Sequence, residues 1–191
     1  NYNLTTNDMT GRGYRVERVG LSLFTYFFQL PNFSAAFPFL NSVRIDTNYL
    51  GTTITEPMFG GIFAVIPLLW CLALLPFIYK KMIKGHRLAL CLLPLGLSIF
   101  IGAFDAQGAG LLQRYVNDFS FLSILAAAVV IFFVYEKARG RLRVYVNTFL
   151  GMATLGSGVY CFLIIFAKYS VELYNRNPLL FNYVSELVQF W

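Results

Sequence analysis

The stretch that decides the fold is GGIFAVIPLLWCLALLPFIY, residues 60–79, which contains no charged side chain. At 1.5 Å of rise per residue, a helix of this length measures about 30 Å, the hydrocarbon thickness of a bilayer. Three more apolar runs follow it along the chain, at residues 88–104, 119–135 and 145–167. The sequence therefore predicts an all-α, polytopic membrane protein with about four transmembrane helices.

The composition favours the bilayer as the solvent of this chain. Of its 191 residues, 58% are hydrophobic and 13% are charged, and the charged share is about half that of a soluble domain. The chain opens on Asn1 in a polar stretch that is typical of the middle of a loop. We therefore expect it to be part of a longer protein, and the remainder of that protein to be one of its partners.

Two basic loops predict the orientation. Residues 80–87 and 136–143 hold eight of the fifteen Lys and Arg residues, whereas the loop between the second and third runs holds only Arg114. Short basic loops remain in the cytoplasm. We expect a multi-pass protein of a cell membrane, bacterial in origin, with both ends of this chain extracytoplasmic. The net charge of +6 is explained by this topology and predicts no nucleic-acid partner.

The predicted organisation has three parts. Residues 1–59 form an extracytoplasmic segment, in which the apolar run at 19–30 is too short to span and predicts a helix at the membrane interface. Residues 60–167 form the four-helix transmembrane region. Residues 168–191 form an extracytoplasmic segment with an amphipathic helix that starts near Pro178.

The prolines and the cysteines inside the apolar runs predict different local features. We expect helix kinks at Pro67, Pro76 and Pro94. The cysteines have no metal-ligand spacing, so we expect small buried apolar side chains and no metal site at Cys71, Cys91 and Cys161.

The candidate binding residues lie in QRYVNDF, residues 113–119. Arg114 and Asp118 are four positions apart, so on a helix they would share a face and pair. Charges near membrane depth are unfavourable unless they are paired or wetted, and they mark functional candidates. We expect Arg114, Asp118 and Gln113 to bind a lipid phosphate. The alternative is that Arg114 only extends to the headgroups while Asp118 caps the third span.

Other charges predict further contacts on the outer face. The candidates are Arg44, Glu56 and Asp105, although Glu56 is also explained as a marker of the membrane boundary. Three arginines at helical spacing are expected to contact lipid phosphates, namely Arg12, Arg15 and Arg18.

Several catalytic motifs are absent from the sequence. It has no phosphate-binding P-loop, no HExxH, no GxSxG and no dinucleotide-binding glycine pattern. The four apolar runs also contain no Asp, Glu, Lys or Arg, which makes them a poor pathway for ions or protons.

The segment FFQLPNFSAAFPF at 27–39, with Arg114–Tyr115 and Asp118–Phe119 at the mouth of the third span, resembles the C-terminal part of GT-C class glycosyltransferases. In that class, Pro-rich patterns often follow the Arg-Tyr pair, whereas Val116 and Asn117 stand here. The resemblance implies transfer of a sugar from a polyprenyl-phosphate carrier, with the catalytic base in an outer loop that precedes this chain. No other cofactor is expected.

The expected function is thus the carrier-binding portion of a membrane glycosyltransferase for cell-envelope glycans, whose partners are the bilayer and a lipid-linked sugar or anionic lipid. Whether the protein is an enzyme stays open. The alternatives are a non-catalytic scaffold of envelope assembly and a component of a lipid or polysaccharide transporter.

Overall fold

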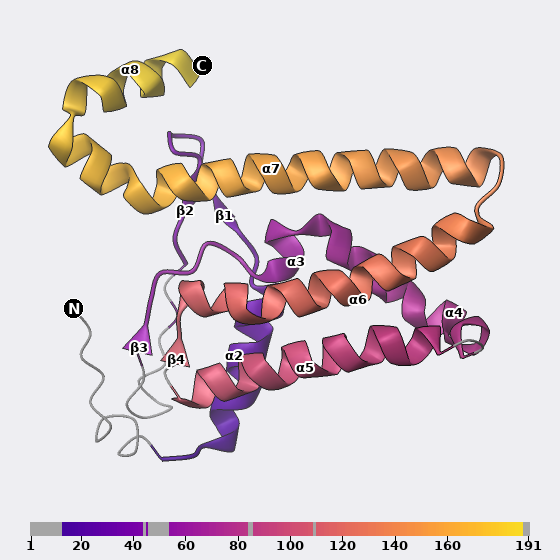
Figure 1. Ribbon diagram of the computed structural model, residues 1–191. Helices are drawn as coiled ribbons and strands as arrows, with labels where there is room; N and C mark the ends of the chain where they lie inside the picture. Colours follow the sequence, from indigo (N-terminus) through magenta and orange to yellow (C-terminus); the bar gives the residue numbers. More distant parts are fainter. Residues whose placement is uncertain (1–12, 44, 46–53, 84–85, 109, 189–191) are drawn as a thin grey trace.

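The computed structural model describes residues 13–43, 45, 54–83, 86–108 and 110–188 (Figure 1). The described part is dominated by helices, as the sequence predicts. The longer elements are α2 (Val16–Phe28), α5 (Arg87–Gly108), α6 (Val116–Lys137), α7 (Arg141–Arg176) and α8 (Pro178–Val188). Shorter helices are α3 (Ile62–Val65), the 3₁₀ helix η2 (Pro67–Leu74), α4 (Leu75–Met82) and the 3₁₀ helix η3 (Gln113–Tyr115).

Three of the predicted spans are confirmed as long apolar helices. Among the described residues, the segments Arg87–Gly108, Gln113–Lys137 and Arg141–Arg176 are long and apolar enough to cross a membrane. Each extends beyond the apolar run that predicted it, because polar residues at both ends continue the helix. A helix of 22 residues, such as α5, reaches about 33 Å.

The first predicted span, at residues 60–79, is not a continuous α-helix. The chain there forms α3, then η2, then α4. Ile66, which precedes Pro67, has φ −125° and ψ 79°, because a residue before proline is displaced from the helical region. Pro76 lies in the first turn of α4, whereas Pro94 lies inside the unbroken α5. The structure therefore confirms an interruption at Pro67 and shows three long helices instead of four.

The core lies mainly between α5 and α6. Small residues allow the two helices to approach closely: Ala126 and Ala127 are fully buried. The thiols of Cys91 and Cys71 lie 3.5 Å from the carbonyl oxygens of Ala126 and Ala127, respectively. These two cysteines are buried as predicted, but Cys161 on α7 is exposed, contrary to the prediction.

Helix α2 crosses the α5–α6 pair (Figure 1). It confirms that a helix forms in the predicted 19–30 segment, and it ends at Phe28, shortly before Pro31. Tyr26 and Phe27 both pack their rings on Phe119 of α6, at centroid distances of 5.2 and 5.5 Å. The helix is thereby fixed to the end of the bundle where α6 begins.

In the described ranges, four two-residue strands connect the helices. The strands β1 (Asn32–Phe33) and β2 (Leu40–Asn41) pair antiparallel. The strands β3 (Ile54–Thr55) and β4 (Gly110–Leu111) pair parallel. The second pair joins the segment before the first apolar run to the turn between α5 and α6.

Helix α7 packs loosely against the rest of the chain. Of its most apolar part only 11% is buried, against 39% for the span that contains α6. Helix α8 begins at Pro178 as predicted, and the Leu180 N–H donates to Asn177 Oδ1 at 3.0 Å, which caps its first turn. Phe181 of α8 packs on Tyr174 of α7 and on Phe37 of the β1–β2 loop, with centroids 5.5 and 5.3 Å away.

The two predicted cytoplasmic loops lie at the same end of the bundle (Figure 1). An ion pair between Arg87, at the start of α5, and Glu136, at the end of α6, joins them. We call this end the basic-loop end. The opposite end, where α5 turns into α6, carries Arg114 and is called the Arg114 end.

Candidate functional site

The turn from α5 to α6 presents the predicted site residues. Gly110 adopts φ 111°, a conformation that favours glycine, and this reverses the chain directly after α5. Leu111 then accepts a hydrogen bond of 2.8 Å from the Glu56 N–H, which extends the β3–β4 pairing. The backbone pairing therefore brings Glu56 to the same end of the bundle as Arg114.

Tyr26 fixes this turn from beneath. Its hydroxyl donates to the Gly110 carbonyl at 2.9 Å and accepts from the Leu112 N–H at 3.2 Å. The ring is fully buried, and burial raises the pKa of the Tyr26 hydroxyl well above its usual range. The hydroxyl therefore stays protonated and acts as a structural link between α2 and the turn.

Gln113 has a structural contact. Its Oε1 accepts a hydrogen bond of 3.2 Å from the Phe59 N–H. This contact connects the turn to the chain that leads into α3. The structure thus assigns part of the Gln113 amide to holding the backbone beside Arg114.

Arg114 pairs with Glu56 and not with Asp118. Its Nε lies 3.8 Å from Glu56 Oε1, and its guanidinium lies 5.5 Å from the centre of the Tyr115 ring. The Arg114 side chain is 49% exposed and that of Glu56 is 24% exposed. The predicted pair fails because Arg114 belongs to η3 and α6 begins only at Val116, so a spacing of four does not put the two side chains on one helical face.

Two further carboxylates lie at the Arg114 end. Asp118 is exposed in the first turn of α6, where the helix dipole favours a negative charge. It makes no capping hydrogen bond, since Tyr115 occupies the N-cap position. Asp105 of α5 lies within electrostatic reach of Asp118, and its buried Oδ2 receives no hydrogen bond within the described part of the chain. These carboxylates add negative charge and proton acceptors beside Arg114.

The start of α2 is tied to the end of α5 by a residue that sequence reasoning missed. Gln107 Nε2 donates to the Arg15 carbonyl at 2.6 Å, and its Oε1 accepts from the Arg15 N–H at 3.3 Å. The expectation that Arg18 contacts lipid is wrong, because this residue is 1% exposed and its Nη1 donates to the Gly13 carbonyl at 3.1 Å. No local signal in the sequence distinguishes Arg18 from Arg15, which is exposed.

Two of the arginines expected on the outer face, Arg44 and Arg12, lie outside the described residues. Within the ranges that the structure describes, no group of three or more His, Cys, Asp or Glu side chains is placed to hold a metal ion.

An apolar groove of about 470 Å³ runs beside α2. Its lining comes from α2, α3, η2, α4 and α5, and includes Phe24, Phe27, Phe28, Phe63 and Leu95. Phe27 also stacks on Phe119, five positions after Arg114. One lining residue of the groove therefore contacts the first turns of α6, the helix that follows Arg114.

Chemically, the Arg114 end combines a half-exposed guanidinium, paired on one side with Glu56, with the carboxylates of Asp105 and Asp118. Among these groups the guanidinium is the one that can contact an anion, and the groove beside α2 can take a long apolar group. Comparison of the chain with protein-family models, with curated proteins and with solved structures finds no match.

Proposed function

We propose that the Arg114 end binds the phosphate of a membrane lipid, and that the chain is the carrier-binding portion of a membrane glycosyltransferase. The observation that supports the proposal is the position of the Arg114 side chain. Glu56 engages its Nε at one edge of the guanidinium, and the side chain is half-exposed. The terminal nitrogens are suited to a bidentate contact with phosphate oxygens.

The groove beside α2 supports a lipid as the ligand. It has almost exclusively apolar walls, and its lining residue Phe27 stacks on Phe119, five positions after Arg114. The phosphate would lie at Arg114 and the isoprenoid chain along the phenylalanines of α2. A soluble phosphate compound would gain nothing from the second part of this arrangement.

The transferase step follows from the resemblance of the outer segment and the Arg-Tyr and Asp-Phe pairs to GT-C class enzymes. In the step, the acceptor hydroxyl oxygen bonds to the anomeric carbon, the bond from that carbon to the carrier phosphate oxygen breaks, and a base takes the hydroxyl proton. The leaving phosphate keeps the electron pair, and Arg114 stabilises its charge. The resemblance implies that the base comes from an outer loop other than the turn that carries Arg114.

Binding of a polyprenyl-phosphate analogue to the full-length protein in nanodiscs tests the binding site. Replacement of a charge-assisted hydrogen-bond donor loses about 1.5–3 kcal/mol, or roughly tenfold or more in Kd, so we expect this loss in Arg114→Ala. Arg114→Lys should bind poorly too, because lysine offers no planar fork.

The matched control is Arg176→Ala, which removes an exposed arginine that is paired with Glu172 on α7. This variant should bind like the wild type. Equal binding by wild type, Arg114→Lys and Arg114→Ala would remove Arg114 from the site and contradict the proposal.

A second measurement separates the enzyme from its alternatives. The full-length protein is incubated with a lipid-linked sugar and an acceptor glycan, and the amount of sugar joined to the acceptor is measured. Transfer that falls in Arg114→Ala supports the enzyme. Lipid binding without any transfer favours the non-catalytic scaffold.

A further inference from the structure

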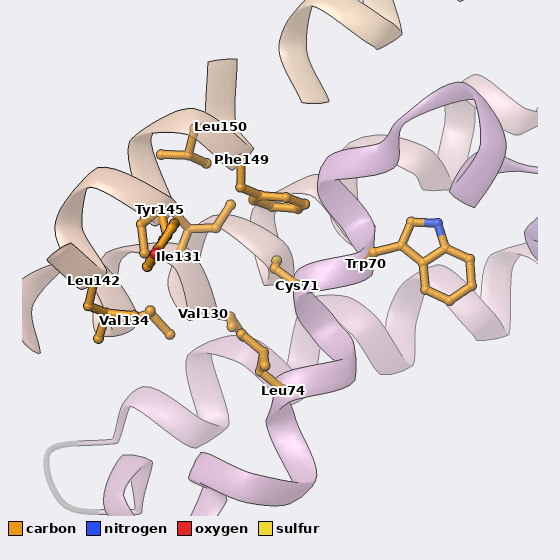
Figure 2. A pocket seen from close by; sticks show the side chains of 11 residues that line it. Trp70, Cys71, Leu74, Val130, Ile131, Val134, Leu142, Tyr145, Phe149 and Leu150 are labelled. Carbon is orange, nitrogen blue, oxygen red and sulfur yellow. The ribbon is translucent and has the colours of Figure 1, made fainter. Parts of the chain in front are cut away.

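At the basic-loop end, α6 and α7 diverge from their connecting loop and leave an apolar groove of about 330 Å³ between them. Figure 2 shows Val130, Val134, Leu142 and Tyr145 gathered between the two helices, with Cys71 of η2 nearby and the Trp70 indole turned away at the far side. This groove is separate from the Arg114 end, and it shares no lining residue with the groove beside α2.

The end of this groove nearest the α6–α7 loop is basic. Arg141 precedes the lining residue Tyr145 by four positions, and Arg143 precedes Val146 by three, so each arginine lies one helical turn closer to the loop. Both arginines are exposed, as is Lys137 at the end of α6. Cations are thus concentrated where the apolar lining ends.

The acidic residue of this loop is already engaged. Glu136 pairs with Arg87 of α5. The Arg143 Nη2 donates to the Tyr135 hydroxyl at 2.9 Å, and its guanidinium lies 4.8 Å from the centre of the Tyr135 ring. Tyr135, the neighbour in sequence of the lining residue Val134, therefore contacts the cation without neutralising it.

We propose that this groove binds one acyl chain of an anionic phospholipid, whose phosphodiester headgroup contacts Arg141 and Arg143. The apolar lining selects a lipid chain, and the cations at its mouth select a negative headgroup. The loose packing of α7, of whose most apolar part 11% is buried, leaves room for a lipid between helices of the same chain.

The test places a tryptophan reporter in the groove of a full protein in which every other tryptophan is replaced by phenylalanine. Phe149 lines the groove, so Phe149→Trp is made with Trp70→Phe and Trp191→Phe. Quenching by brominated phosphatidylglycerol and by brominated phosphatidylcholine is then compared in bilayers of matched composition. A juxtamembrane cation contributes about fivefold to the binding of an anionic lipid, so we expect a preference of at least fivefold for phosphatidylglycerol.

Two reporters and three variants make the result specific. Phe162→Trp in the same background lies 13 residues further along α7, about 20 Å away, and should show almost equal quenching by the two lipids. Arg141→Gln with Arg143→Gln should abolish the preference that the groove reporter shows. Lys80→Gln with Lys81→Gln removes two cations from the same end and should preserve it. Tyr135→Phe keeps both arginine charges and should preserve the preference as well.

Equal quenching of the groove reporter by both lipids would overturn the proposal. So would a preference that survives the double arginine variant, or one that Lys80→Gln with Lys81→Gln abolishes equally. Circular dichroism of each variant establishes that it is folded before quenching is compared.

Discussion

At the scale of single residues, Tyr26 holds the turn at the Arg114 end in place through two hydrogen bonds to its backbone. Its hydroxyl satisfies one carbonyl and one N–H of the turn between α5 and α6. Both backbone groups are buried with it. A buried group that loses its hydrogen-bond partner is destabilised by about 1–3 kcal/mol.

Tyr26→Phe should therefore lower the free energy of unfolding by about 1–3 kcal/mol, as measured by denaturant unfolding in detergent. The matched control is Tyr183→Phe on α8, whose side chain is 64% exposed, and it should change stability little. Equal stability of the two variants would show that the Tyr26 hydroxyl does not hold the turn.

The same scale shows what the sequence could and could not predict about the candidate site. Local spacing identified Arg114 as a notable charge and placed Asp118 beside it. The observed partner is Glu56, 58 positions earlier, and the two meet because β3 pairs with β4. Strands of two residues leave no periodic signal in the sequence, so neither this pairing nor the role of Tyr26 was accessible to pattern analysis.

At the scale of elements, the crossing of α2 with the segment before α3 requires a residue without a side chain. A Cβ atom at Gly61 would lie 2.6 Å from the Phe27 carbonyl carbon and oxygen and 2.7 Å from the Gln29 nitrogen. These are backbone atoms and cannot move aside as a flexible side chain can. The Gly61 N–H also donates to the Gln29 carbonyl at 2.8 Å.

Gly61→Ala is expected to lower the thermal midpoint in detergent, because one of the two backbone segments must shift and the hydrogen bond to Gln29 is disturbed. Gly96→Ala is the control. Gly96 lies inside α5 with no atom near its Cβ position, and alanine is the better helix former. A midpoint for Gly61→Ala at or above that of Gly96→Ala would contradict the close crossing.

The α5–α6 pair contains a polar contact in its buried seam. Ser98 Oγ lies 2.7 Å from Ser123 Oγ and donates to the Phe119 carbonyl at 2.9 Å. Polar contacts between membrane helices couple by about 0.6 kcal/mol on average. They contribute to helix association in a solvent where apolar burial contributes little.

A double-mutant cycle of Ser98→Ala and Ser123→Ala should give a coupling free energy of about 0.6 kcal/mol. The comparison cycle pairs Ser98→Ala with Ser157→Ala. Ser157 bonds to the Ala153 carbonyl of its own helix at 3.0 Å, so this second cycle should be additive. Additivity in both cycles would mean that the contact across the two helices contributes nothing.

Helices were predicted correctly where the length of an uninterrupted apolar run is enough to determine them. The helices α5, α6 and α7 correspond to three predicted spans, and α8 begins at its predicted proline. The prediction of a continuous helix at 60–79 is wrong. This run is as long and apolar as the others, but Pro67 interrupts the hydrogen bonds of the helix. Pro94 leaves α5 unbroken, so the presence of a proline does not by itself predict which helix is interrupted.

At the scale of the whole molecule, both basic loops lie at one end and the Arg114 end lies at the other (Figure 1). The positive-inside rule then predicts that the whole basic-loop end faces the cytoplasm. Exposed tyrosines at the two extremes of the described chain, Tyr14 and Tyr183, provide positions for an accessibility test.

In a background without Cys71, Cys91 and Cys161, single cysteines are introduced at Tyr14, Tyr183, Lys81 and Arg139. An impermeant maleimide added to intact cells should label positions 14 and 183 only, and positions 81 and 139 should react after permeabilisation. Labelling of position 139 in intact cells would reverse the orientation.

Helix α7 is longer than a membrane crossing requires. Its 36 residues extend about 54 Å, whereas the hydrocarbon layer is about 30 Å thick. The last turns carry the exposed Glu172–Arg176 pair, and α8 packs on this end of α7 through the rings of Phe181 and Tyr174. A bilayer crossing by α7 would therefore leave roughly 24 Å of this helix outside the hydrocarbon layer, and the helix end that carries α8 is one of the two parts that this excess length can extend.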